Sequence, residues 1–119
     1  MKFEKFTDKA QEAVVEAQQI ALKLDNQQVD VEHLNMALLE QEDGLIPKLL
    51  EIMGTDTSSL KQELQQERYR LPKVYGTSVE QVYPTRRFNQ VLIKAEDETK
   101  RFKDEFISVE HIYLVILGE

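Results

Sequence analysis

The chain repeats its own pattern at a fixed offset, and this duplication constrains the fold more than any other feature. Adding 78 to a residue number places Thr85 on Thr7 and aligns Val-Glu-His at 31–33 with Val-Glu-His at 109–111. Apolar residues coincide across both copies without a gap. Because solenoid repeats have shorter periods of roughly 20–50 residues, this offset indicates a duplicated half-domain of several helices instead.

Helical spacing dominates the first copy. Apolar residues at steps of three and four predict a helix over about 8–24, with Thr7 as its N-cap. Asp30 is a second N-cap, before the segment 31–39, which is apolar nearly all round. Such a segment is typical of a buried helix, so we expect it at the centre of the fold.

Two shorter helices follow in the first copy. Gly44 and Gly54 bracket a helix over about 45–53. Asp56 or Thr57 then caps a fourth helix that runs to about residue 68.

These patterns predict an all-α fold of two tandem pseudo-symmetric helical repeats. Repeat 1 covers about 1–69, a linker with two Pro and one Gly covers about 70–84, and a partial repeat 2 covers about 85–119. We expect a second buried helix over 109–117 to pair with 31–39. Counterparts of 41–71 would fall at 119–149, so we expect a truncated second repeat and a chain that is a fragment of a longer protein.

Charge and composition exclude several classes of protein. The net charge is −7, with −8 on the segment 1–67 and +1 on the segment 68–119, so the chain is poorly suited to binding phosphate backbones. There is no cysteine, no apolar run near the ~20 residues of a membrane span, and no secretory signal. We therefore expect a soluble, cytoplasmic protein that binds neither nucleic acid nor membrane.

Catalytic motifs are absent from the sequence. It contains no P-loop, no dinucleotide fingerprint, no nucleophile elbow and no His-Glu-x-x-His motif. His33 and His111 occupy equivalent places near helix starts, where a structural role is favoured, although a cross-repeat metal site would be possible if the two helix starts met. We expect no catalytic residue, no cofactor and no metal in this chain.

Three segments resemble the N-terminal domain of the Clp/Hsp100 chaperone ATPases over nearly the whole chain. They are Phe6-Thr7-Asp8-Lys9-Ala10-Gln11-Glu12-Ala13, Val31-Glu32-His33-Leu34 with Ala37-Leu38-Leu39, and Asp104-Glu105-Phe106-Ile107-Ser108-Val109-Glu110-His111-Ile112. The linker residues Leu71-Pro72-Lys73-Val74, followed by Val82-Tyr83, are most similar to those of the ClpB disaggregases.

The resemblance implies a substrate-receiving module that performs no chemistry itself. Its partners would be unfolded or aggregated polypeptides. The parent protein would bind ATP and Mg, form a homohexamer and cooperate with the Hsp70 system. The alternative is a domain like those of ClpA and ClpC, which dock folded adaptor proteins for a protease.

The resemblance also implies six substrate-binding residues, namely Thr7, Leu92, Ala95, Asp104, Glu110 and His111. Thr7, Asp104 and Glu110 match polar residues implicated in substrate handling, and the others match an apolar groove. Thr7 keeps its role as a helix cap beside the functional one. Two residues depart from the family pattern: Lys94 stands where an apolar groove residue is expected, and Lys103 replaces the usual Gly.

Overall fold

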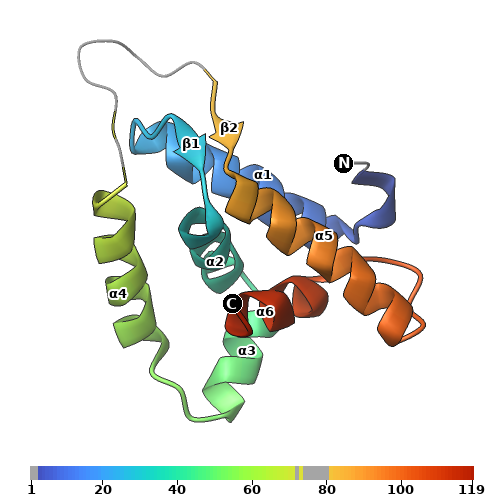
Figure 1. Cartoon of the computed structure of the whole chain (residues 1–119). Helices are drawn as coiled ribbons and strands as arrows, with labels where there is room; N and C mark the ends of the chain where they lie inside the picture. Colours follow the sequence, from blue (N-terminus) through green and yellow to red (C-terminus); the bar gives the residue numbers. More distant parts are fainter. Residues whose placement is uncertain (1–2, 72, 74–80) are drawn as a thin grey trace.

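The computed structural model is mainly helical, with one pair of very short strands, and it describes residues 3–71, 73 and 81–119 (Figure 1). The elements are η1 (Phe3–Lys5), α1 (Asp8–Lys23), β1 (Gln28–Val29), α2 (Val31–Glu40), α3 (Leu45–Ile52), α4 (Thr57–Tyr69), β2 (Tyr83–Pro84), α5 (Arg86–Arg101) and α6 (Val109–Leu117). The prediction of an all-α fold is confirmed. None of the described helices has the length and apolar character needed to cross a bilayer.

The duplication is visible in the helix boundaries. Adding 78 to the first and last residue numbers of α1 gives those of α5, and the same step leads from the start of α2 to the start of α6. The caps follow the same rule, since the Thr7 and Thr85 side chains each accept a backbone N–H in the first turn of their helix. Equivalent sequences therefore build equivalent helix pairs, α1–α2 and α5–α6.

Two short parallel pairings join the repeats, and each uses the equivalent positions with the roles exchanged. Val29 of β1 pairs with Pro84 of β2, while Ile107 pairs with Phe6. The N–H of the residue after each partner then donates across the junction, from Thr7 to the Ile107 carbonyl at 2.9 Å and from Thr85 to the Val29 carbonyl at 3.0 Å. Each repeat therefore contacts the other through equivalent residues, as in an approximately two-fold symmetric pair.

Part of the predicted linker is structured for this reason. We predict a linker over about 70–84, and within it Tyr83–Pro84 is a strand, because the backbone entering α5 pairs across the repeats as the backbone entering α1 does. Most of the remaining linker, residues 72 and 74–80, lies outside the described residues.

The core lies where α1, α2, α5 and α6 meet (Figure 1), and the two predicted central helices contribute unequally. Seven of the ten residues of α2 are buried. In α6, His111 and Ile112 are buried, but Leu114 and Leu117 are 50% and 64% exposed. The expectation of a fully buried helix over 109–117 is therefore wrong for its second half. The reason is that α2 is covered by both α1 and α4. The helix α6 is covered by α5, the equivalent of α1, but no described helix takes the place of α4.

The start of α4 gives a pH-dependent prediction. Asp56 accepts hydrogen bonds from the Ser59 hydroxyl at 2.8 Å and from the Ser59 and Ser58 N–H groups at 3.3 and 3.1 Å. These bonds, the Ser59 hydroxyl first, lower the pKa of Asp56 below its ordinary value of 3.8. A carboxyl with a lowered folded-state pKa stabilises the fold above its ordinary pKa, and this contribution is lost as the pH falls through the folded-state value.

We therefore expect the first turn of α4 to fray as the pH falls below the ordinary Asp pKa. The measurement is the backbone ¹³Cα shift of Ser58, Ser59 and Leu60 during an acid titration. Asp56→Asn keeps a capping side chain without a titrating group. An identical acid transition in this variant would show that Asp56 is not responsible.

Candidate functional site

The loop between α5 and α6 places Asp104 through a defined helix ending. Lys103 adopts the left-handed conformation with φ of +58°. The Asp104 N–H donates to the Thr99 carbonyl at 2.8 Å, and the Lys103 N–H donates to the Lys100 carbonyl at 3.3 Å. This is a Schellman ending, in which glycine usually takes the left-handed position because it has no Cβ. Lys103 therefore stands where glycine is usual, and its backbone adopts the left-handed conformation that this position requires.

The following helix start fixes His111 against Asp104. The Ser108 N–H donates to His111 Nδ1 at 2.9 Å, so that nitrogen is unprotonated in the capping box. The proton of the neutral ring is then on Nε2, which lies 2.8 Å from Asp104 Oδ2 and donates to it. His111 is buried, whereas the Asp104 side chain is half exposed.

The first repeat holds His33 in the same way. Its Nδ1 accepts from the Asp30 N–H at 2.9 Å, and its Nε2 lies 2.9 Å from Asn26 Oδ1. Both ring nitrogens of each histidine are therefore engaged in hydrogen bonds, which supports the structural role over the metal site. In the described part of the chain, no three potential metal-ligating side chains gather at one place.

Thr7 and Glu110 meet at one cavity of about 440 Å³, formed where α1, α3 and α6 begin. Thr7 caps α1, with its hydroxyl oxygen accepting from the Ala10 N–H at 3.2 Å, so the predicted capping role is present. The charged residues around the cavity are Asp8, Lys9, Asp43 and Glu110. The cavity is therefore acidic.

Leu92 and Ala95 do not reach the surface. They are 3% and 0% exposed and belong to the hydrophobic core. The structure thus brings Thr7 together with Glu110 and Asp104 together with His111, but it does not place Leu92 or Ala95 where a partner could touch them.

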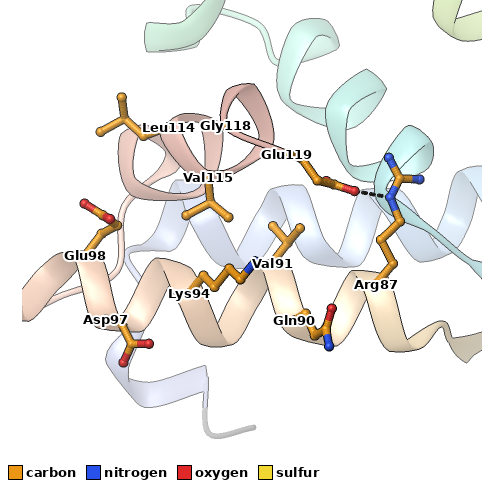
Figure 2. Close-up of a pocket in the computed structure, with 10 residues that line it drawn as sticks. All are labelled: Arg87, Gln90, Val91, Lys94, Asp97, Glu98, Leu114, Val115, Gly118 and Glu119. Carbon is orange, nitrogen blue, oxygen red and sulfur yellow. Dashed lines mark hydrogen bonds and ion pairs between the residues drawn. The ribbon is translucent and has the colours of Figure 1, made fainter.

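A groove of about 370 Å³ runs between α5 and α6 (Figure 2). It is lined by Arg87, Gln90, Val91, Lys94, Asp97, Glu98, Leu114, Val115, Gly118 and Glu119. Leu114, which is half exposed, and the partly buried Val115 provide its apolar surface, whereas Val91 lines the groove but is itself buried. Of these residues, sequence reasoning connected only Lys94 with a groove, as a charge at a position where an apolar residue is expected. The family pattern, which has an apolar residue at this position, was the sequence feature that indicated a groove here.

Arg87 closes one end of the groove and joins the repeats. Its guanidinium forms ion pairs with Glu32 and Glu119 and lies 3.6 Å from Asp30. Partial burial lowers the pKa of Arg87, but the hydrogen bonds to Glu32 and Glu119 more than offset this and raise the pKa above its ordinary value. Arg87 therefore remains charged, and its charge is already compensated within the protein.

The fold is a duplicated helical domain with a groove between α5 and α6. The family model described as the Clp repeat (R) N-terminal domain matches residues 5–119, so the chain belongs to the Clp N-terminal repeat domain family. It is 44% identical over 117 residues to the chaperone protein ClpB of Nitratidesulfovibrio vulgaris, covering 97% of this chain. It is also 44% identical over 119 residues to ClpB of Clostridium perfringens, covering 98% of this chain. In both comparisons the chain spans 14% of the relative's length.

Solved structures share the fold at lower identity. The Hsp104 N-terminal domain from Candida albicans has a TM-score of 0.84 and 21% identity, covering 95% of this chain and 73% of that one. The N-terminal domain of the ClpV1 ATPase from E. coli has a TM-score of 0.86 and 17% identity, covering 98% of this chain and 70% of that one. The resemblance inferred from the sequence is therefore confirmed.

Proposed function

We propose that this chain is the substrate-binding N-terminal domain of a ClpB-type protein disaggregase, and that it engages unfolded or aggregated polypeptides through the α5–α6 groove. The observation that carries the proposal is the apolar surface that Leu114 and the partly buried Val115 leave open in the groove between two helices. Exposed apolar surface bordered by polar groups is typical of protein interaction sites. The ClpB relatives, which are named as chaperones, support the same role.

The proposal assigns the chemistry to other parts of the parent protein. ATP and Mg would bind in ATPase modules outside this chain, and the parent would be a cytoplasmic homohexamer that works with the Hsp70 system. Each domain would bind its substrate weakly. Weak sites suit a ring, because linking several of them raises the effective concentration without tight individual contacts.

The test is a titration of the ¹⁵N-labelled domain with a permanently unfolded protein, such as reduced and carboxymethylated α-lactalbumin. We expect saturable shifts at Val91, Leu114 and Val115, with binding weakened severalfold in Leu114→Ser. Ile93→Ser is the matched control, because Ile93 is 52% exposed, close to the 50% of Leu114, and does not line the groove.

Two outcomes would count against this function. Binding that is equally sensitive to both substitutions would show that the groove has no special role. Capture of one folded protein with micromolar affinity, without binding to the unfolded probe, would favour the adaptor-docking alternative.

A further inference from the structure

The α5–α6 groove has a counterpart between α1 and α2. This second groove, of about 360 Å³, is lined by Lys9, Glu12, Glu16, Ala37, Glu40, Gln41 and Glu42. Adding 78 to six of these positions gives residues that line the α5–α6 groove, namely Arg87, Gln90, Lys94, Val115, Gly118 and Glu119. The duplication has therefore produced two grooves with largely equivalent lining positions and nearly the same size.

The two grooves differ in charge. The α1–α2 groove contains four glutamates and one lysine, so it is strongly acidic. At the equivalent positions of the α5–α6 groove, Gln90 replaces Glu12 and Lys94 replaces Glu16. At the six equivalent positions, Lys94 therefore reverses one negative charge, Gln90 and Gly118 each remove one, and Glu119 adds one.

Most other charges in the α5–α6 groove are compensated within the protein. Arg87 is paired with Glu32 and Glu119, and Glu98 lies 3.6 Å from Arg101. Lys94 forms no ion pair with any of the residues that the structure describes, and its side chain lies along α5 beside Val91 (Figure 2). Its ammonium group is therefore available to a ligand. Lys94 lines the same groove as the apolar residues Leu114 and Val115.

We infer that Lys94 makes the α5–α6 groove selective for polypeptide segments that carry an aspartate or glutamate beside an apolar residue. This inference rests on the proposed function. The apolar residue of the segment packs on Leu114 and Val115 while its neighbouring carboxylate meets Lys94. Asp97, one turn further along α5, repels a carboxylate and so limits it to the Lys94 side.

Exposed ion pairs are weak, so the selectivity is modest. An attractive pair gained in one peptide and a repulsive pair in another together change the affinity by about threefold to tenfold. Salt screens exposed charges, so this ratio falls towards one at high ionic strength. The packing of the apolar residue depends much less on salt, so overall binding persists.

The experiment uses three short peptides that share a Leu-Phe pair and differ in the next residue, which is Asp, Ser or Lys. Each is titrated into the labelled domain at low and at high ionic strength. For the unmodified domain we expect the Asp peptide to bind about threefold to tenfold more tightly than the Lys peptide at low salt. Lys94→Gln removes the preference and Lys94→Glu reverses it.

Lys100→Gln is the matched control. Lys100 is an exposed lysine on the same helix that does not line the groove, so the preference remains in this variant. A preference that persists in Lys94→Gln, or that disappears equally in Lys100→Gln, overturns the inference while leaving the proposed function standing. Failure of all three peptides to shift Val91, Leu114 and Val115 counts against the proposed function itself.

Discussion

Replacing Leu92 with Ala is expected to lower the free energy of unfolding by about 2–5 kcal/mol, whereas Leu114→Ala is expected to lower it by about 0.5 kcal/mol or less. Leu92 is 3% exposed and Leu114 is 50% exposed. Truncating the first removes buried apolar surface and leaves a cavity, while truncating the second removes atoms that already contact water. Urea denaturation of the two variants measures both values.

The same two variants separate stability from binding. Under conditions in which both remain folded, Leu114→Ala should weaken binding of an unfolded polypeptide more than Leu92→Ala does, because Leu114 lines the groove. A Leu92→Ala variant of undiminished stability that has lost binding would contradict this. It would instead place Leu92 at the binding surface, as the family resemblance implied.

Helix positions could be predicted from the sequence because their signals are local. Thr7 and Asp30 stand directly before the predicted helices, and the side chain of each accepts a backbone N–H in the first turn of its helix. The duplication added a second, independent indication of the same pattern. The predicted helix over about 8–24 agrees with α1 to within one residue at its end, and α5 begins and ends 78 residues further on.

The groove could not be predicted in the same way because periodicity does not show which flank of a helix remains uncovered. Val91 and Leu92 are adjacent, and both are buried, yet Val91 lines the groove and Leu92 lies in the core. The difference depends on where α6 crosses α5. The ion pairs of Arg87 with Glu32 and Glu119 could not be predicted either, because Glu32 lies 55 residues away in the chain.

The histidine pairs were partly predictable. Their structural role near helix starts followed from their positions after Asp30 and Ser108, but their partners depend on the preceding helix endings. Asp25 and Lys103 both have positive φ, 57° and 58°, and each directs the next residue towards the histidine. The glycine expected at 103 was the one sequence signal for this turn.

The second large effect is expected at His33. His33→Ala should lower the free energy of unfolding by about 3 kcal/mol or more, because it removes one buried and one partly buried hydrogen bond and leaves a cavity. His33 is 0% exposed, and its partner Asn26 is also buried. The substitution leaves the Asn26 side chain and the Asp30 N–H without these bonds. Thermal or urea unfolding monitored by circular dichroism measures the loss.

His111→Ala is the internal control, because it removes the equivalent histidine from the second repeat. Its partner Asp104 has a half-exposed side chain that water can solvate when the histidine is lost. The cost should therefore be smaller than for His33→Ala by about 1 kcal/mol or more. Equal losses in the two variants would show that partner burial does not set the cost. In that case the common capping bond to Nδ1, which both repeats share, would account for it.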